Sequence, residues 1–170
     1  MEHVLVVNAQ DEVIGTMEKM EAHRTGTLHR AFSVLVFNSR GEMLIQKRAH
    51  TKYHSPALWT NACCSHPRPE EDILDAGKRR LKEEMGIDAT PTFAYKFTYK
   101  TIFNPRMIEH EVDHVLVATY DGSPTVNQTE VEDWKFVSME ELKKDIAADP
   151  QRYTSWFKLI MDHKHPVPTL

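Results

Sequence analysis

Alternating apolar and polar positions predict that most of the chain folds as β-strands. Short runs rich in Val, Ile, Leu and Phe recur between polar turn sequences, which is typical of strands that bury at least one face. Two of these turns, at residues 8–11 and 38–41, separate neighbouring runs and predict two β-hairpins. The predicted strands cover residues 3–8, 12–17, 31–37, 42–47, 58–63, 92–101, 108–120 and 134–137.

The strand predicted over residues 92–101 has an aromatic side chain at every second position. Successive side chains of a strand point to opposite faces, so this spacing predicts one aromatic face. The four residues are Phe93, Tyr95, Phe97 and Tyr99.

One long helix is predicted between two strands. Asp72 is a suitable N-cap, and Gly86 is a suitable terminator. Between them, Ile73, Leu81 and Met85 form an apolar stripe at helical spacing.

Further helical signals lie near the two ends of the chain. Residues 138–141 form a capping box that predicts a helix to about residue 148. Residues 149–150 predict the start of a last helix with proline at its first position. Residues 18–25 predict a loop or a short helical turn, and residues 164–170 predict a frayed tail. The apolar face of the last helix contains Tyr153, Trp156, Phe157 and Ile160.

The order of elements indicates one domain over residues 1–170 with a mixed α/β (α+β) fold. Strands precede and follow a single inserted helix, and the remaining helices come last, so we expect a largely antiparallel or mixed sheet flanked by helices. A length of 170 residues suits one domain with one core.

Composition and charge restrict the cellular setting. The formal net charge of −4 gives no reason to expect nucleic acid or membrane as a partner. No apolar run approaches the roughly 20 residues of a membrane span, and the sequence at Met1 lacks the signature of a signal peptide. The neighbouring cysteines Cys63 and Cys64 make a poor disulfide framework, so we expect a reduced, cytoplasmic protein.

Three acidic residues alternate along the strand predicted over residues 108–120. Glu109, Glu111 and Asp113 share one face, where like charges repel and where Glu and Asp are poor strand formers. A bound divalent metal would compensate for the repulsion, because carboxylates bind hard cations. The alternative is an ordinary solvated sheet face.

Other reactive side chains lie in polar loops or at strand edges. His23, His29 and His66 could together help to complete the shell of one divalent ion, but their spacing is not diagnostic. Taken singly, each fits an ordinary surface or hydrogen-bonded role better. Cys64 is a candidate nucleophile or acid–base group, and Cys63 competes with it. The cations that suit a phosphate group are Lys19, Arg48, Lys52 and Arg80.

The end of the predicted helix carries two carboxylates, Glu83 and Glu84. Acidic side chains are disfavoured there by about 0.3–1 kcal/mol each, because a helix C-terminus is the negative end of its dipole. A bound cation would reverse this effect, and ion pairs with Arg79 and Arg80 are the alternative.

This helix resembles the second half of the Nudix box. Two departures, Arg80 in place of the usual glutamate and a missing leading glycine near Pro69, weaken the case for hydrolysis. The matching residues are Arg79, Glu83, Glu84, Gly86 and Ile87.

Two further segments resemble motifs of the type I isopentenyl-diphosphate isomerases. Residues 61–67, Asn-Ala-Cys-Cys-Ser-His-Pro, are similar to the cysteine motif of that family, and residues 108–112 to its paired-glutamate motif. Segments around His23, His29 and Arg48 agree in order and spacing, so the resemblance extends from residue 2 to residue 156.

The resemblance implies a Nudix-like fold and a metal-dependent isomerase that interconverts isopentenyl and dimethylallyl diphosphate. Cys64 and Glu111 would be the acid–base pair, Tyr99 the active-site tyrosine, and Trp156 the indole at the closed end of the pocket. The implied ligands of one divalent ion, Mn²⁺, Zn²⁺ or Mg²⁺, are His23, His29, His66, Glu109 and Glu111. Glu84 would help to hold a second ion, Mg²⁺, on the substrate diphosphate, which would also contact Lys19, Arg48, Lys52 and Arg80.

Two other functions use the same residues differently. A Nudix hydrolase of a nucleoside or prenyl diphosphate would need the box carboxylates and not Cys64. A catalytically inactive binding module would not need the His and Glu ligands. The substrate implied by the resemblance is a small prenyl diphosphate, and we expect a monomer or weak homodimer.

Overall fold

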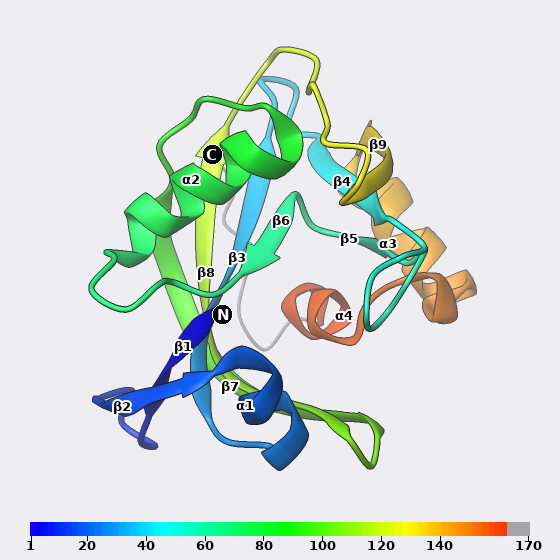
Figure 1. Cartoon of the computed structure of the whole chain (residues 1–170). Coiled ribbons are helices and arrows are strands. Elements are labelled where there is room, and N and C mark those ends of the chain that lie inside the picture. The colour runs from blue at the N-terminus through cyan, green and yellow to red at the C-terminus, as the bar shows by residue number, and fades with distance from the viewer. Residues whose placement is uncertain (163–170) are drawn as a thin grey trace.

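The computed structural model describes residues 1–162, in which the strands form one nine-stranded mixed sheet (Figure 1). In this range no helix has the length and apolar character of a membrane span. The strands are β1 (His3–Val7), β2 (Val13–Glu18), β3 (His29–Phe37), β4 (Met43–Arg48), β5 (Trp59–Thr60), β6 (Cys63–Ser65), β7 (Thr92–Asn104), β8 (Met107–Thr119) and β9 (Val131–Val137). The helices are α1 (Lys19–Thr25), α2 (Ile73–Met85), α3 (Met139–Ala148), a 3₁₀ turn (Pro150–Arg152) and α4 (Ser155–Met161).

Strand β3 is the centre of the sheet because four other strands pair with it. It runs parallel to β8 from the pair His29–Glu111 to the pair Phe37–Thr119. It also pairs antiparallel with β1, β4 and β6. This register places the first residue of β3 beside the middle of the acidic strand β8, which decides where the functional site forms.

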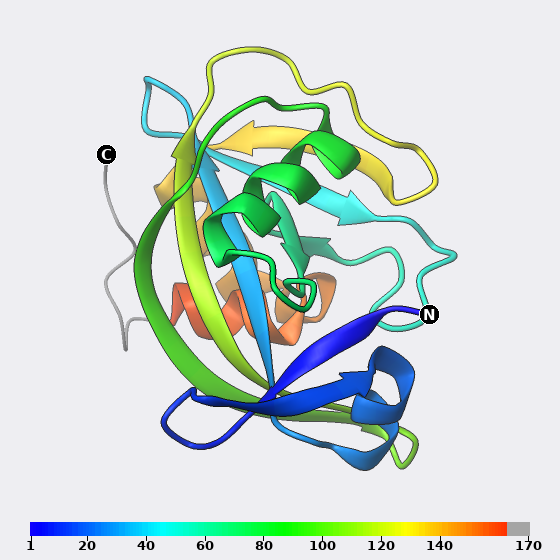
Figure 2. The same ribbon diagram turned by 60° about the vertical axis from the view of Figure 1, so that its left-hand side comes forward.

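Each face of the sheet is covered by helices, as Figure 2 shows for α2 on one side and for α3 and α4 on the other. Because side chains alternate along a strand, Leu35 and Phe37 pack in the core beneath α3 and α4, and Val34 and Val36 pack beneath α2. All four are at least 97 % buried, and burying such a side chain contributes about 1.5–3 kcal/mol. The two cores fix the sheet between the helical layers.

Helix α2 lies close to the sheet and ends sharply. A Cβ atom at Gly77 would lie 2.8 Å from Leu116 Cδ1, so glycine permits the close approach. At the C-terminus, Gly86 adopts φ +64° and its N–H donates to the Lys82 carbonyl oxygen at 3.1 Å. The N–H groups of Thr125 and Asn127 then satisfy the last carbonyls of α2, which fixes the end of the helix against that loop.

The mixed sheet flanked by helices was predicted from the sequence and is confirmed. Two details of the strand predictions were wrong. Residues 58–63 form parts of two short strands, β5 and β6, rather than one. Phe93 lies opposite Leu116 and Tyr95 opposite Val115, because a bulge inserts one residue between them; only Tyr95, Phe97 and Tyr99 therefore share the inner face, and Phe93 is half exposed.

The helix predicted from residue 149 also needs correction. Pro150 opens only a short 3₁₀ turn, and α4 begins at Ser155, where Thr154 accepts a hydrogen bond from the Phe157 N–H. The stretch 18–25 contains a true helix, α1, capped by Glu18. The predicted frayed tail, 164–170, lies outside the described residues.

Gly86→Ala should destabilise the protein by about 1–3 kcal/mol. The new Cβ would collide with the carbonyl oxygen of Thr125, and a positive φ strains any L side chain. Urea unfolding measures the change. Gly15→Ala is the matched control: nothing lies within 4 Å of its Cβ position, so its effect should stay within about 0.5 kcal/mol. Equal effects of the two substitutions would show that the end of α2 does not require glycine at position 86.

Asp11 links the β1–β2 turn to the central strands. Its carboxylate lies 2.9 Å from Arg30 Nε, 3.0 Å from Lys96 Nζ and 2.8 Å from His114 Nε2. Burial raises the pKa of Asp11, but the hydrogen bonds from Lys96 and Arg30 outweigh burial and hold this pKa below its usual value of 3.8. Asp11 therefore stabilises the fold above the unfolded-state pKa, and this contribution is lost as the pH falls through the lower folded-state pKa.

Asp11→Asn should therefore flatten the acid limb of the stability profile. Between about pH 5 and pH 2 the wild type should lose more unfolding free energy than the variant, as followed by urea unfolding at each pH. Glu140→Gln, which removes an exposed carboxylate on α3, should keep the wild-type slope. Parallel wild-type and D11N profiles would argue against the role of this carboxylate.

Candidate active site and metal centre

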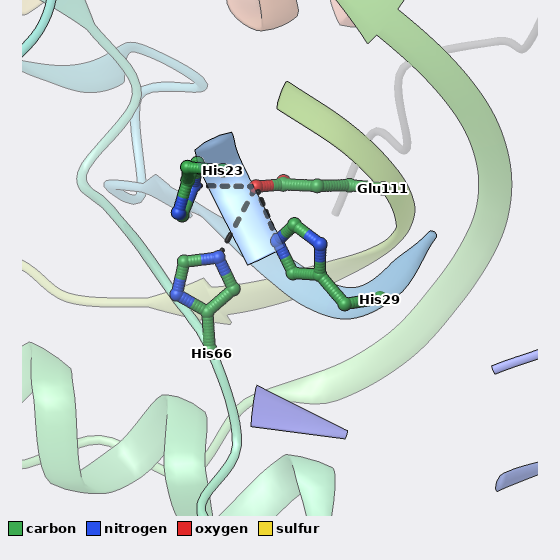
Figure 3. Close-up of side chains that lie close together, drawn as sticks. All are labelled: His23, His29, His66 and Glu111. Carbon is green, nitrogen blue, oxygen red and sulfur yellow. Dashed lines mark hydrogen bonds and ion pairs between the residues drawn. The ribbon is translucent and has the colours of Figure 1, made fainter. Parts of the chain in front are cut away.

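Three imidazoles and one carboxylate converge at the start of β3 (Figure 3). His23 comes from α1, His29 from β3, His66 from the segment after β6, and Glu111 from β8. Glu111 Oε1 lies 3.1 Å from His66 Nε2, 3.3 Å from His29 Nε2 and 3.9 Å from His23 Nε2. The four candidate ligand atoms lie within 4.8 Å of one another, and all four residues are buried. The structure thus brings together four of the five residues expected to bind the first metal ion.

The hydrogen bonds of this cluster suit a metal ion. The backbone carbonyl oxygens of Lys19 and Thr27 lie 2.7 Å from His23 Nδ1 and 2.8 Å from His29 Nδ1, so each Nδ1 carries the proton. The Nε2 atoms of both rings are buried and lack a hydrogen-bond partner. A metal-ligating histidine is oriented in this way, with one nitrogen held by a backbone acceptor and the other free to coordinate. The donor set of nitrogens and one oxygen therefore fits a divalent cation.

The charge states of the cluster are also suited to binding a cation. Burial, together with the nearby His66, lowers the pKa of His23 to about 4, so this ring is neutral at neutral pH. Burial alone would raise the pKa of Glu111, but the contacts of its carboxylate with the His29 and His66 imidazoles outweigh burial and hold this pKa well below the usual value. His23 therefore offers a neutral nitrogen and Glu111 an ionised oxygen. Burial also lowers the pKa of His66, whereas at His29 burial is outweighed by the contact with Glu111, which raises the pKa of that ring.

Glu109, the fifth expected ligand, lies beside the cluster and faces other partners. The Tyr99 hydroxyl is within hydrogen-bond distance of Glu109 Oε1, and it lies 2.9 Å from Glu111 Oε2. The second Glu109 oxygen lies 3.3 Å from His54 Nε2. Burial and the charge of Glu111 raise the pKa of Glu109 well above its usual value. Its coordination of the metal stays a prediction.

The two cysteines point in opposite directions because they are adjacent on β6. Cys63 is fully buried in the core beneath α2. Cys64 lines a cavity beside the histidine cluster. Its Sγ lies 3.1 Å from Asn61 Oδ1 and accepts a hydrogen bond from Trp156 Nε1 at 2.8 Å. Burial and the nearby Asp113 raise the pKa of Cys64 to about 12, so the thiol keeps its proton. Only Cys64 is placed to react with a bound molecule.

One cavity of about 460 Å³ joins these parts. Its lining includes Cys64, His66, Tyr99, Glu111 and Trp156, whereas His23 and His29 lie fully buried outside its lining. All the residues expected to contact substrate also line it, namely Lys19, Arg48, Lys52, Arg80 and Trp156.

Trp156 contacts both a cation and the thiol. The Arg48 guanidinium lies 5.3 Å from the centre of the indole ring and donates to the carbonyl oxygens of Ser55 and His54. His54 stacks on Phe103 at 5.0 Å and meets the indole edge-on at 5.6 Å. The apolar wall of the cavity is therefore built from rings held by polar contacts at their edges.

Three of the four cations expected to bind diphosphate, Lys19, Lys52 and Arg80, already have carboxylate partners. Lys19 Nζ lies 2.7 Å from Glu2 Oε2. Arg80 contacts Glu84, which is 96 % buried and whose other oxygen accepts from Gln46 Nε2 at 3.1 Å. The sequence offered ion pairs with Arg79 and Arg80 as the alternative to a bound cation at the end of α2, and these ion pairs are present. They are not all on the surface, because Glu84 is buried. Its role toward a second ion stays a prediction.

Two residues of the cavity were missed by the sequence analysis. The sequence analysis gave no role to His54, which the structure distinguishes by its contacts with Glu109, Phe103 and Trp156. Glu130 lies 2.8 Å from Arg80 and was not considered at all. It is separated from Arg80 by 50 positions, so no local spacing connects the two.

Comparison with known proteins defines the class first. The NUDIX domain family model matches residues 27–157. A solved structure from Deinococcus radiodurans superposes with a TM-score of 0.78 at 20 % identity, covering 96 % of this chain and 100 % of that one. The fold is therefore a Nudix fold, as expected.

Curated relatives define the family within this class. "Isopentenyl-diphosphate Delta-isomerase 2" of Aromatoleum aromaticum is 45 % identical over 161 residues, which is 95 % of this chain and 85 % of the relative. "Isopentenyl-diphosphate Delta-isomerase" of Serratia proteamaculans is 42 % identical over 94 % of this chain and 89 % of the relative. The chain belongs to the isopentenyl-diphosphate Delta-isomerase family.

His29→Ala should weaken binding of a divalent metal by at least about tenfold, because it removes a proposed direct ligand. Even the loss of a residue that only orients a metal ligand lowers metal affinity by about 10–100-fold. Metal content after dialysis and titration with Mn²⁺, Zn²⁺ and Mg²⁺ measure the effect. His50→Ala is the control, since that ring is exposed and pairs with Glu132. Equal metal retention by both variants would exclude the cluster as the metal centre.

Proposed function

We propose that this protein is a metal-dependent isomerase that interconverts isopentenyl diphosphate and dimethylallyl diphosphate in isoprenoid biosynthesis. The observation that carries the proposal is that a thiol and a carboxylate, Cys64 and Glu111, line one cavity beside a buried three-histidine cluster. Membership of the isomerase family supports the same reaction.

The reaction moves a double bond by one carbon and needs two proton-transfer groups. One group gives a proton to the terminal alkene carbon, which leaves a tertiary carbocation at the next carbon. The other group removes a proton from the carbon on the far side of this cationic centre. We assign these roles to Cys64 and Glu111, assisted by the Tyr99 hydroxyl that contacts Glu111. Because the reaction is reversible, each group is the donor in one direction and the acceptor in the other.

The cavity walls would protect the carbocation. Trp156 presents an indole whose N–H is anchored on Cys64, and its ring is a suitable partner for a positive charge, with about 2 kcal/mol or more available when water is excluded. Trp156 is 3 % exposed and Tyr99 is 7 % exposed. This closed environment would hinder capture of the cation by water.

The metal centre is proposed to use His23, His29, His66 and Glu111, with Glu109 as a fifth ligand. When bound, a divalent ion of the Mn²⁺, Zn²⁺ or Mg²⁺ type would supply positive charge that organises Glu111 and its neighbours. Glu84 is proposed to serve a Mg²⁺ ion that accompanies the diphosphate. The diphosphate oxygens would be bound by four cations that line the same cavity, Lys19, Arg48, Lys52 and Arg80.

The free thiols bear on the cellular setting of the enzyme. We propose one domain over the whole chain, a cytoplasmic location and a monomer or weak homodimer. Both thiols are free, and the reaction needs Cys64 reduced, which supports a reducing compartment.

Proton NMR tests the reaction directly. Protein incubated with isopentenyl diphosphate and Mg²⁺ in deuterated water should form the allylic isomer and exchange deuterium into carbon-bound positions. Release of phosphate without isomerisation would instead identify a Nudix hydrolase, and a preparation that neither turns over substrate nor retains metal would identify an inactive module.

The two cysteines give a matched pair for the same assay. Cys64→Ala should lower kcat by at least about 10³-fold because it removes one of the two proton-transfer groups. Cys63→Ala removes a neighbouring thiol that packs in the core and should keep most of the activity at a temperature where it stays folded. Similar activities of the two variants would refute the role of Cys64.

A further inference from the structure

Glu130 contacts two of the cations that are proposed to bind diphosphate. Its Oε1 accepts a hydrogen bond from Arg80 Nη2 at 2.8 Å and lies 3.7 Å from Lys52 Nζ. The Glu130 carbonyl oxygen accepts from the Ala49 N–H at 3.0 Å, which ties this residue to the loop that carries Lys52. Glu130 also lines the cavity. Its carboxylate is therefore held at the place where the diphosphate is expected.

Arg80 is surrounded by carboxylates. In addition to Glu130, its guanidinium contacts Glu84 and donates to Glu83 Oε2 at 2.6 Å. Arg80 Nη2 donates to both Glu84 and Glu130, so a diphosphate that binds this nitrogen must displace at least one of these two carboxylates. The displaced charge matters most for Glu84, which is 4 % exposed, because a buried charge left without a partner is strongly destabilising.

We propose that Glu130 is a positioning residue that competes with the substrate diphosphate for Arg80 and Lys52, so that the anion binds tightly only together with a divalent cation. The inference rests on the proposed function and adds to it a residue without an assigned role.

Exchange of ion-pair partners explains the coupling. A diphosphate alone takes Arg80 away from Glu84 and Glu130, and a cation alone takes Glu84 away from Arg80. When both ligands bind, the cation would compensate the two carboxylates, Glu84 and Glu130, that lose Arg80, and the diphosphate would replace these carboxylates beside Arg80. Each ligand thus restores the partner that the other removes, which makes their binding mutually favourable.

The competition has a use in turnover. Substrate and product carry the same diphosphate, so tight binding of this group stabilises both equally and does not accelerate the chemistry. A carboxylate that returns to Arg80 and Lys52 would limit such binding and favour release of the product.

Calorimetry with inorganic pyrophosphate tests the proposal by binding alone. The protein carries its tightly bound metal and is dialysed free of excess ions, and titrations are compared without and with added Mg²⁺, after correction for Mg²⁺–pyrophosphate association. Without Mg²⁺, Glu130→Gln should bind pyrophosphate at least fivefold more tightly than the wild type. The gain in affinity caused by Mg²⁺ should fall at least threefold in the variant.

Glu132→Gln is the matched control, since that carboxylate pairs with Lys47 at 3.0 Å and His50 at 2.9 Å and does not line the cavity. It should behave as the wild type. Glu130→Ala, checked for folding by thermal unfolding, should shift affinity in the same direction as Glu130→Gln.

Three outcomes would overturn the proposal. Unchanged pyrophosphate binding would show that Glu130 does not compete. Weaker binding without Mg²⁺ would show that Glu130 orients the cations for the anion. Loss of Mg²⁺ affinity in the absence of pyrophosphate would make Glu130 a metal ligand. A protein that binds pyrophosphate as expected but does not isomerise substrate would refute the proposed function and leave the role of Glu130 intact.

Discussion

The pairing of His29 with Glu111 across two parallel strands is the constraint on which the site depends. β3 and β8 are 82 positions apart in the chain at this pair, and their register decides which side chains meet. A shift by one residue would turn Glu111 to the other face of the sheet and place it among the apolar residues beneath α2. The two apolar cores therefore do more than stabilise the fold, because the alternation of Val34, Leu35 and Val36 fixes the register that brings imidazole and carboxylate together.

The same alternation separates reactive from structural groups elsewhere. Cys63 and Cys64 are chemically identical, but β6 directs one thiol into the core and the other into the cavity. Inspection of the residues left both as candidates, and the choice of Cys64 came from the resemblance to a family motif. The face of a strand can be assigned only when its pairing partners are known, and the partner of β6 lies about 30 positions earlier.

Local signals in the sequence predicted much of the fold. Caps, glycine terminators and period-two patterns placed most elements correctly, because these features depend on neighbouring residues. The errors have equally local causes: the bulge before Tyr95 changes the face of Phe93, and the capping of α4 by Thr154 overrides the signal at Pro150. The convergence of His23, His29 and His66 was implied by the family resemblance and not by their spacing. Contacts such as those of His54 and Glu130 depend on loops that return from distant positions, for which the sequence carries no periodic signal.

Charge balance at the end of α2 explains how a site rich in carboxylates can accept an anion. The C-terminus of this helix is the negative end of its dipole, and it carries Glu83 and Glu84 in its last turn. Two backbone N–H groups, from Thr125 and Asn127, satisfy the last carbonyls. Arg79 and Arg80 pair with the two carboxylates from within the same helix. Arg80 stands where the Nudix box usually has another glutamate, so this site has one carboxylate fewer and one cation more than the box would provide. The consequence is a region suited to holding the diphosphate of the proposed substrate, in the same cavity that Cys64 and Glu111, the proposed proton-transfer groups, line.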